Sequence, residues 1–320
     1  MFNVITVKNK LFNLLLVTLL TVISFVLVAC SGTNKTVYEV NQGIREVEVE
    51  KPLVMASMYP IYSIAQELAG DKIKVELILP PGESPHIFNP AISTKKNIIN
   101  SKAVFYIGHG LDNWVLDLLD DKSKAVSVDK NIILRKISEN THEEHVNGAY
   151  DPHYWLDPRN AKLIANTIIA KYISINPDND KYYQTQLSAF HLEIDQLYRN
   201  SFEKTRDISK YPLITFHDAW HYFSEAFRLN IVGTFEAVGS EEPTPKHLKN
   251  LQDKIAKYKV KVLFSEPQLS TNSLNTFIKD NGLTIAILDP VGGIEDRMSY
   301  EQLISYNIET MINSFKESEN

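Results

Sequence analysis

The chain has 320 residues, of which 44% are apolar and 22% are charged, and its formal net charge is -6. An apolar content this high excludes a disordered chain and is enough for one large core or two moderate ones, so we expect two lobes. The mildly acidic balance argues against nucleic acid as a partner and is compatible with small cations.

The N-terminus is typical of an export signal. Lys8 and Lys10 precede an uncharged stretch, residues 11–29, that ends in Leu-Val-Ala directly before Cys30. A basic segment, an apolar segment and a small residue before the cleavage point are the parts of a signal peptide, here residues 1–29. An uncleaved membrane anchor is the alternative, because a stretch of this length could just span a bilayer.

Cys30 favours cleavage and lipid attachment. The sequence Leu-Val-Ala-Cys resembles the lipobox of bacterial lipoproteins, in which the cysteine thiol receives a diacylglycerol and becomes the new N-terminus. We therefore expect a protein held in the cell membrane by lipid, with palmitate among its acyl chains, on the extracytoplasmic face. Cys30 is the single cysteine, so a metal site in the mature chain must be built from nitrogen and oxygen ligands.

After the signal, the pattern predicts a polar, flexible tether (30–52), an N-terminal lobe (53–176), a long linking helix (177–209) and a C-terminal lobe (210–320). In both lobes, apolar strand patterns alternate with helical ones, which predicts an α/β fold with mostly parallel sheets covered by helices. The strands are expected at residues 53–57, 73–79, 103–107, 125–128, 213–216, 231–235, 260–265 and 284–288. The two lobes look like loose copies of one plan.

Two features predict the central helices. Asp157 is a suitable N-cap, and Pro158 occupies the first helical position after it. The linking helix has apolar residues at helical spacing and no glycine or proline from Asp178 to Ile208. About 30 residues at roughly 1.5 Å each give a rod of roughly 45 Å, which is long enough to reach from one lobe to the other.

Side chains that commonly bind metals follow four of the predicted strands. His217, Glu266 and Asp289 come directly after their strands, and His86 follows the strand at 73–79 through the segment PPGESP. The carboxyl ends of parallel strands face the ligand crevice, so these residues should converge there. Each residue by itself has an ordinary reading as a hydrogen-bonded surface or core group.

A further imidazole lies in the segment DPHYWLDP, where His153 is flanked by two Asp-Pro pairs. Pro152 and Pro158 restrict the backbone, which would hold the ring with little loss of entropy. Asp-Pro pairs are also common turn formers and helix caps. The candidates are far apart in the sequence, so only the fold could assemble them into a metal site.

The motifs PPGESPHIFNP, DPHYWLDPRNAKLIANTI, ITFHDAWHYF, VLFSEPQLS and ILDPVGG, in this order and together with the lipobox, resemble the metal-binding solute-binding lipoproteins of bacterial ABC transporters. The resemblance implies two α/β lobes, each with a four-stranded sheet, joined by one long rigid helix, with metal in the cleft between them. It places the ligands at His86, His153, His217 and Asp289. Manganese binders of this family usually have Glu at the third position and zinc binders have His, so His217 favours zinc.

Some positions depart from the family pattern or stay open. Ser84 and Asn89 stand where the family commonly has acidic residues near its first ligand, so the affinity could differ. Glu266 is either an alternative ligand to Asp289 or a partner of a ligand, and we favour the second role. The segment THEEH contains His142 and His145, which form either a weak auxiliary metal site or part of a solvated charged loop.

The resemblance predicts a function in uptake. We expect a monomer, not an enzyme, that captures a divalent transition metal, Zn2+ rather than Mn2+, and delivers it to the permease of an ABC transporter. A manganese-specific protein of the same family is the nearest alternative. The alternatives from other classes are a zinc hydrolase, with Asp289 or Glu266 as base, and a surface adhesin.

Overall fold

The computed structural model describes residues 35–38, 45–48, 50–137, 150–235, 244–268 and 274–319. Internal contacts divide the chain into two compact units, and the boundary in the sequence lies between Lys51 and Pro52. Among the described residues, none of the helices combines the length and the apolar character needed to cross a membrane. The predicted signal peptide, Cys30, His142 and His145 all lie outside the described residues.

The first unit contains a pair of short strands. Strands β1 (Lys35–Tyr38) and β2 (Arg45–Glu48) run antiparallel, with Lys35 opposite Glu48. They lie within the polar stretch for which we predicted a flexible tether. In β2, Val47 lies between Glu46 and Glu48, an alternation that suits a strand, but one valine among charged residues is a weak sequence signal.

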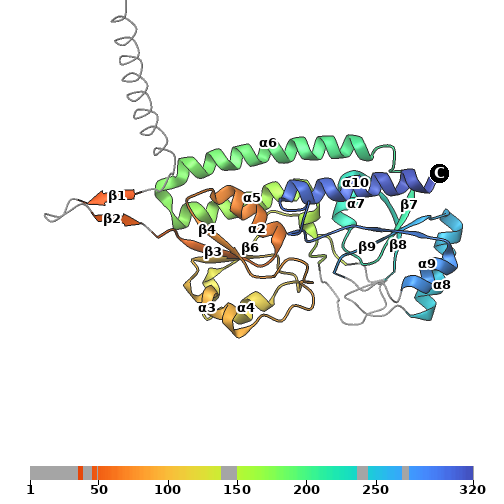
Figure 1. Ribbon diagram of the computed structural model, residues 1–320, viewed down its shortest axis with the longest axis horizontal. Coiled ribbons are helices and arrows are strands. Elements are labelled where there is room, and N and C mark those ends of the chain that lie inside the picture. Colours follow the sequence, from red (N-terminus) through yellow and green to blue (C-terminus); the bar gives the residue numbers. More distant parts are fainter. Residues whose placement is uncertain are drawn as a thin grey trace, which may run out of the picture. The chain divides into compact units, whose positions relative to one another are not determined.

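The N-terminal half of the second unit is built on a parallel sheet in the order β4-β3-β5-β6. Each strand lies inside its predicted range: β3 (Leu53–Ala56), β4 (Lys74–Leu77), β5 (Ala103–Tyr106) and β6 (Ala125–Ser127). The accompanying helices are α2 (Tyr59–Ala69), α3 (Ile92–Asn100), α4 (Trp114–Leu118) and α5 (Pro158–Ile175). Figure 1 shows α3 and α4 on one side of this sheet and α2 and α5 on the other.

The C-terminal half has a second parallel sheet, in the order β10-β9-β7-β8. Its strands are β7 (Pro212–Thr215), β8 (Asn230–Thr234), β9 (Val262–Ser265) and β10 (Thr284–Ile287). Its helices are α7 (His221–Phe227), α8 (Pro245–Tyr258), α9 (Leu274–Asn281) and α10 (Tyr300–Glu319).

The two sheets share one topology. In each, the first strand along the chain pairs with the second strand on one side and with the third on the other, and the fourth lies beyond the third. Parallel strands require crossover connections, which the helices between them provide. The expectation that the two halves follow one plan agrees with this arrangement.

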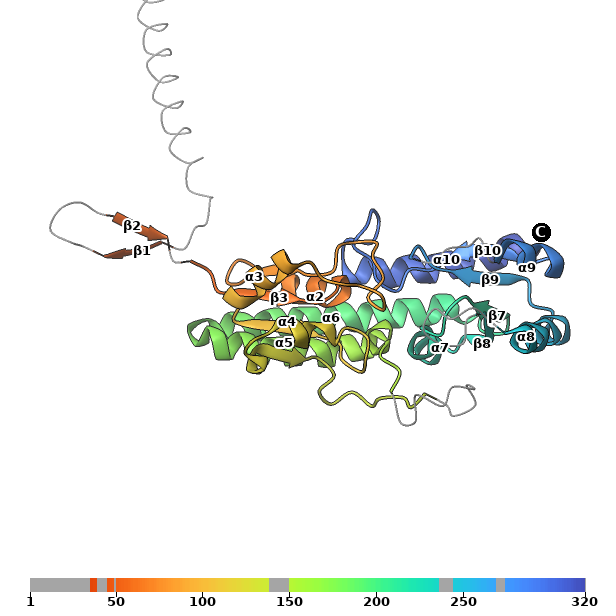
Figure 2. The same cartoon turned by 90° about the horizontal axis from the view of Figure 1, so that it is seen from below.

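Helix α6 (Asp180–Thr205) joins the two halves and contacts α2, α5, α7 and α10. Figures 1 and 2 both show it running alongside the two halves of the unit. It is shorter than the predicted linking helix at both ends: Pro177–Asn179 forms a separate 3-10 turn, η3, before it, and the helix ends at Thr205. The start of α5 is as predicted, since the Asp157 carboxylate accepts a hydrogen bond from the backbone N–H of Arg159.

The apolar core crosses from one half to the other. One cluster of buried apolar side chains includes Val54 of β3, Phe190 of α6 and Phe264 of β9. Each sheet has a further cluster on its other face, with Met55 in the N-terminal half and Ile214 in the C-terminal half. Val54 and Met55 are neighbours in one strand and enter different clusters because successive side chains of a strand point to opposite faces. A shared core of this kind ties the halves together.

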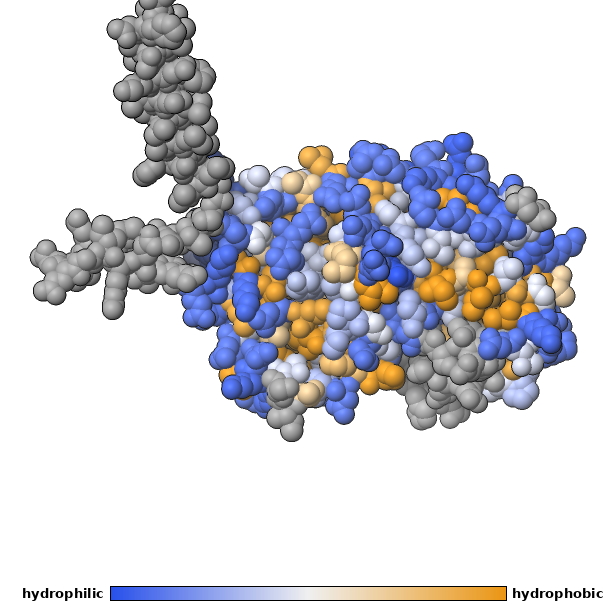
Figure 3. Space-filling view, viewed as in Figure 1, coloured by the Kyte–Doolittle hydropathy of each residue, from blue (hydrophilic) through white to orange (hydrophobic). Residues whose placement is uncertain are grey.

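The face shown in Figure 3 carries hydrophilic residues interspersed with apolar patches. Large exposed apolar side chains among the described residues include Ile87, Ile133, Leu192 and Met298, which belong to different segments of the chain. Apolar atoms contribute much of the surface of any folded protein, so scattered residues of this kind do not by themselves indicate a partner.

Candidate metal site

The three predicted histidines lie together. One ring nitrogen from each of His86, His153 and His217 is within 4.8 Å of the other two. The ring centroid of His86 is 5.5 Å from that of His153 and 5.2 Å from that of His217, and the centroids of His153 and His217 are 5.0 Å apart. Imidazole nitrogens gathered in this way are close enough to bind one shared ion.

Both sheets contribute to this cluster. His86 lies on the loop that follows β4, and His217 follows β7 after a single intervening residue, so each is near the carboxyl end of its sheet. His153 precedes the 3-10 turn η2 (Tyr154–Leu156), just before α5. His153 and His217 are buried, whereas His86 is exposed. Solvent therefore reaches the cluster from the side of His86.

Asp151 holds the His153 ring. Its Oδ1 accepts hydrogen bonds from the backbone N–H of His153 at 3.0 Å and from Nδ1 of the same residue at 2.8 Å. The first of these bonds closes a local turn, in which the Asp side chain accepts a hydrogen bond from the backbone N–H two residues later. With the proton on Nδ1 directed at the carboxylate, the lone pair of Nε2 is free to bind a cation.

Glu266 has the same role for His217. Its Oε1 accepts hydrogen bonds from Nδ1 of His217 at 3.0 Å and from the indole Nε1 of Trp220 at 2.9 Å. Glu266 is almost completely buried. The Glu266 carboxylate therefore lies on the Nδ1 side of the His217 ring and is hydrogen-bonded to it.

Three buried atoms at the predicted ligands have no hydrogen-bond partner among the described residues: Nε2 of His153, Nε2 of His217 and Oδ2 of Asp289. Buried polar groups are nearly always paired, because leaving one unpaired costs about 1–3 kcal/mol. All three are lone-pair donors of the type that zinc binds. A cation bound in the cluster of His86, His153 and His217 would accept the lone pairs of the two imidazole nitrogens.

The electrostatics of the cluster differ from one ring to the next. Although His86 as a residue is exposed, desolvation of its ring, together with the neighbouring His153 and His217, lowers the pKa of His86 to about 3. Burial alone would lower the pKa of His217, but the Glu266 carboxylate outweighs it and raises that pKa. For Glu266, burial is likewise outweighed by His217, and the pKa is lowered. His86 is therefore neutral near pH 7, as a ligand must be.

Among the described residues, the group whose ligand atoms lie within 4.8 Å of one another contains the three histidines and does not include Asp289. It follows β10 and is fully buried, and its Oδ1 accepts hydrogen bonds from the backbone N–H groups of Val291 and Gly292 at 2.9 and 3.0 Å. Its Oδ2 lies 3.4 Å from Nη1 of Arg297. The structure thus brings the three histidines together and holds Asp289 by its own loop.

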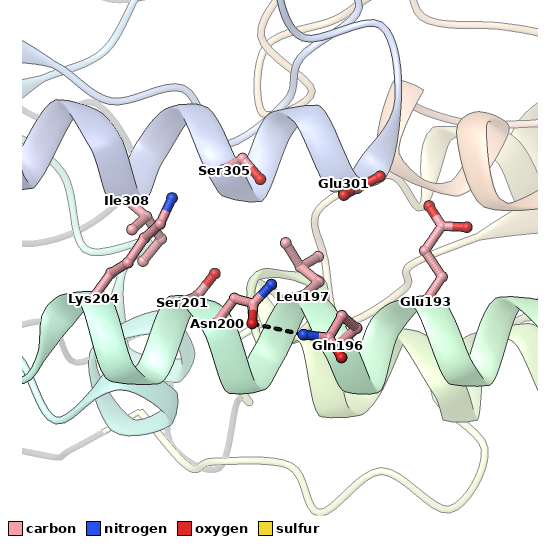
Figure 4. Close-up of a pocket in the computed structure, with 9 residues that line it drawn as sticks. All are labelled: Glu193, Gln196, Leu197, Asn200, Ser201, Lys204, Glu301, Ser305 and Ile308. Carbon is pink, nitrogen blue, oxygen red and sulfur yellow. Dashed lines mark hydrogen bonds between the residues drawn. The ribbon is translucent and has the colours of Figure 1, made fainter.

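A separate cavity of about 310 Å³ lies between α6 and α10 (Figure 4). Its lining includes Glu193, Asn200 and Lys204 of α6 and Glu301 and Ser305 of α10. None of the histidines of the cluster lines it. Among the residues that the structure describes, the lining of this cavity contains no group of three or more His, Cys, Asp or Glu side chains close enough to share a metal ion.

Sequence reasoning missed three residues of the site. Asp151 was read as a turn former, although its position two residues before His153 was a usable signal. Trp220 and Arg297 carried no signal, because their partners Glu266 and Asp289 are reached only through the fold. The predicted auxiliary residues His142 and His145 lie outside the described residues.

Curated relatives resemble the chain over most of its length. It is 28% identical over 284 residues to the metal ABC transporter substrate-binding lipoprotein SloC of Streptococcus mutans, covering 84% of this chain and 91% of that protein. It is 27% identical over 311 residues to the manganese ABC transporter substrate-binding lipoprotein PsaA of Streptococcus anginosus, covering 94% and 97%. The zinc-binding protein AdcA of Streptococcus pyogenes is 23% identical over 298 residues, covering 86% of this chain and 58% of AdcA.

Solved structures share the fold. A crystal structure of ZnuA has a TM-score of 0.73 and 23% identity, covering 83% of this chain and 99% of that chain. A zinc-bound mutant of AdcAII from Streptococcus pneumoniae has a TM-score of 0.73 and 26% identity, covering 82% and 98%. The predicted fold class, two halves with four-stranded parallel sheets and a long helix between them, is confirmed.

The family described as zinc-uptake complex component A, periplasmic, matches residues 54–314. Its members are substrate-binding proteins, which confirms that the chain is not an enzyme and removes the zinc-hydrolase alternative. The names of the relatives include both zinc and manganese. The chain therefore belongs to the family of zinc-uptake complex component A, the substrate-binding proteins of metal ABC transporters of the zinc and manganese type.

Proposed function

We propose that this protein captures Zn2+ outside the cytoplasm with His86, His153, His217 and Asp289 and delivers it to the permease of an ABC transporter. The observation that carries the proposal is the cluster of three imidazoles. Two of them, those of His153 and His217, have a buried Nε2 without a hydrogen-bond partner among the described residues. The buried Oδ2 of Asp289, which accepts no hydrogen bond from the described residues, supports the inclusion of Asp289 as the fourth ligand. Three nitrogens and one oxygen make a closed tetrahedral set that leaves no position for catalytic water.

The donor set favours zinc over manganese. Imidazole is a borderline ligand that suits zinc, whereas manganese prefers carboxylates, carbonyls and water. His217 supplies a nitrogen at the position that separates the two metals in this family. Its partner Glu266 keeps a carboxylate next to the ring while the hydrogen bond to Nδ1 directs Nε2 as the ligand atom.

The manganese alternative has its own support. The manganese-named relative PsaA of Streptococcus anginosus is 27% identical to the chain, whereas the zinc-named AdcA is 23% identical. These identities are too close to separate two metals that members of one family bind. The ligand chemistry therefore decides our choice of zinc.

An adhesin role in addition to transport also has one supporting observation. The laminin-binding protein of Streptococcus agalactiae, described as bifunctional with adhesin and metal-transporting activity, has a TM-score of 0.72 and 26% identity to this chain. Adhesion would be compatible with zinc capture. A protein that bound laminin but no metal would support adhesion alone.

Lipid attachment at Cys30 and a monomeric state are parts of the proposal. A lipid anchor would keep the protein beside the permease while leaving the metal-binding unit in the extracytoplasmic space. The curated relatives SloC and PsaA are named as lipoproteins. A single copy provides all four proposed ligands, so metal capture needs no second chain.

Competitive titration of the purified full chain with zinc and manganese tests the function and the metal. We expect zinc to bind on the order of 100-fold or more tightly than manganese, since three nitrogen ligands favour zinc. His86→Ala should weaken the binding of both metals. His217→Glu should narrow the difference between them, because it replaces a nitrogen donor by an oxygen donor.

His191→Glu is the matched control, because His191 lies on α6 and its ring bonds to the backbone carbonyl of Lys162, outside the cluster. It should leave both affinities unchanged. Tighter binding of manganese than zinc by the unmodified chain would overturn the choice of metal. Absence of binding of either metal would overturn the function itself.

A further inference from the structure

Asp289 has a cationic neighbour that the ligand set does not include. The carboxylate is completely buried, and its Oδ2 accepts no hydrogen bond from the described residues. The Nη1 of Arg297 lies 3.4 Å from that same oxygen, and the Arg297 side chain is only 14% exposed. A buried carboxylate is costly without an opposite charge nearby, so this arginine supplies the compensation.

Arg297 is held in place mainly by contacts with groups other than Asp289. Its guanidinium stacks on the ring of Tyr306, with Cζ 4.1 Å from the ring centroid, and Nε donates a hydrogen bond to the carbonyl oxygen of Glu295. The hydroxyl of Tyr306 donates a hydrogen bond to the carbonyl of Ile287 in β10. Arginine stacks well on aromatic rings through its flat guanidinium. The guanidinium charge of Arg297 is thus held beside Asp289 without a bidentate ion pair between the two side chains.

The backbone around Arg297 is also constrained. The N–H of Gly293 donates to the carbonyl of Arg297 at 2.9 Å, and the N–H of Arg297 donates to the carbonyl of Ile294 at 2.9 Å. Gly292 has a φ of 75° and lies close to that loop, since an added Cβ would be 3.2 Å from the Arg297 carbonyl oxygen. A tight turn therefore returns the chain so that Arg297 faces Asp289.

We infer that Arg297 is a positioning residue that sets the metal affinity of the site, by competing as a fixed positive charge for the Asp289 carboxylate. The inference rests on the proposed function, in which Asp289 is a ligand. A divalent cation at Asp289 must share that carboxylate with the guanidinium, and the two positive charges repel each other in a buried setting. Arg297 thereby stabilises the metal-free protein and weakens metal binding, which favours release.

The test is to measure zinc affinity by competition with a chelator, together with the thermal unfolding midpoint with and without zinc, using the full chain at pH 8. Arg297→Met removes the charge and keeps an apolar stem over Tyr306. We expect it to bind zinc about tenfold more tightly, because one repelling charge is lost. The unfolding midpoint of the metal-free variant should fall, and saturation with zinc should restore most of the loss.

Three further variants sharpen this test. Arg297→Lys keeps the charge and should bind zinc nearly as the unmodified chain does. In the background of Asp289→Asn, Arg297→Met should bring no gain, because the carboxylate for which the charges compete is absent. Arg206→Met removes an arginine from an exposed ion pair with Glu203 and should leave zinc affinity unchanged.

Unchanged or weaker zinc binding by Arg297→Met would overturn the inference while leaving the proposed function in place. A failure of the unmodified chain to bind zinc would instead overturn the proposed function. If Arg297→Met does not fold, Arg297→Gln removes the same charge while keeping hydrogen-bond donors, and the same two outcomes apply to it.

Discussion

At the scale of single residues, the orientation of the clustered histidine rings depends on two neighbouring carboxylates. His153 is oriented by Asp151 and His217 by Glu266, each through a hydrogen bond to Nδ1. This bond selects the tautomer and leaves Nε2 as the ligand atom. Without these carboxylates the two rings could turn, so we expect Asp151 and Glu266 to contribute to the metal affinity of the proposed site.

Glu266→Gln tests this role. A glutamine in this position can direct its amide N–H at Nδ1 of His217, which would place the ring proton on Nε2 and block the ligand atom. We expect zinc affinity to fall by about 10–100-fold, the usual effect of losing such a partner. The measurement is competition with a zinc chelator. Glu225→Gln on the exposed face of α7 is the control, and equal affinities of the two variants would contradict the role of Glu266.

At the scale of the elements, acidic side chains of three helices meet where α6 packs between the two halves. Glu67 of α2, Glu193 of α6 and Glu301 of α10 form a row in which Glu193 interacts with each of the other two. Figure 4 shows the side chains of Glu193 and Glu301 directed toward each other. Lys204 lines the same cavity and is paired with Glu309. These carboxylates therefore repel one another where three helices meet.

The row predicts a pH dependence of stability. Desolvation, with Glu193 and Glu301, raises the pKa of Glu67 from 4.5 to about 7. The folded protein then binds a proton that the unfolded chain releases between these values, so the free energy of unfolding decreases as the pH rises from 4.5 to 7. Glu67→Gln should flatten this decrease and raise the unfolding midpoint at pH 8 by no more than about 2 °C, because Glu67 is exposed and solvent screens its charge.

Thermal unfolding from pH 4.5 to pH 8 measures the effect of Glu67→Gln. Glu317→Gln, on an exposed position of α10, should follow the curve of the unmodified chain. Parallel curves for Glu67→Gln and Glu317→Gln would show that the row does not couple protonation to folding.

At the scale of the whole second unit, contacts between its halves position the ligand segments. The N–H of the Trp155 indole donates to the carbonyl of Pro290, and the Tyr300 hydroxyl donates to the carbonyl of Trp155. The Tyr59 hydroxyl donates to the carbonyl of Met298. The two bonds of Trp155 join the segments that follow His153 and Asp289, and the Tyr59 bond ties α2 to the second of these segments, so the position of the histidine cluster and the packing of the halves depend on each other.

Gly293→Ala tests this packing. Gly293 has a φ of 83°, and an added Cβ would lie 2.5 Å from Cδ2 of Tyr59 in α2. Gly82→Ala is the matched control, because Gly82 has a φ of 86° and no atom within 4 Å of an added Cβ. Both substitutions incur the cost of positive φ, and only the first creates a clash. We expect denaturant unfolding to show Gly293→Ala less stable than Gly82→Ala by about 1–3 kcal/mol.

Equal stability of the two alanine variants would mean that the loop moves away from Tyr59 at no cost. In that case the contact between the halves at this point would not hold the segment that carries Arg297. A larger loss for Gly293→Ala would support the view that this loop is clamped between the halves.

The sequence alone determined the alternation of strands and helices and the long α6, because each has a local signal. The three histidines were selected by the resemblance of their motifs to a known family, since each histidine by itself has an ordinary reading as a hydrogen-bonded group. Periodic apolar residues reveal elements, Asp157 and Pro158 mark a helix start, and metal-type residues at strand ends converge when strands are parallel. Only the tertiary structure decided that Glu266 orients His217, that Arg297 faces Asp289 and that Glu67 approaches Glu193 and Glu301. These pairs are distant in the chain, and side-chain direction at such distances depends on packing rather than on spacing.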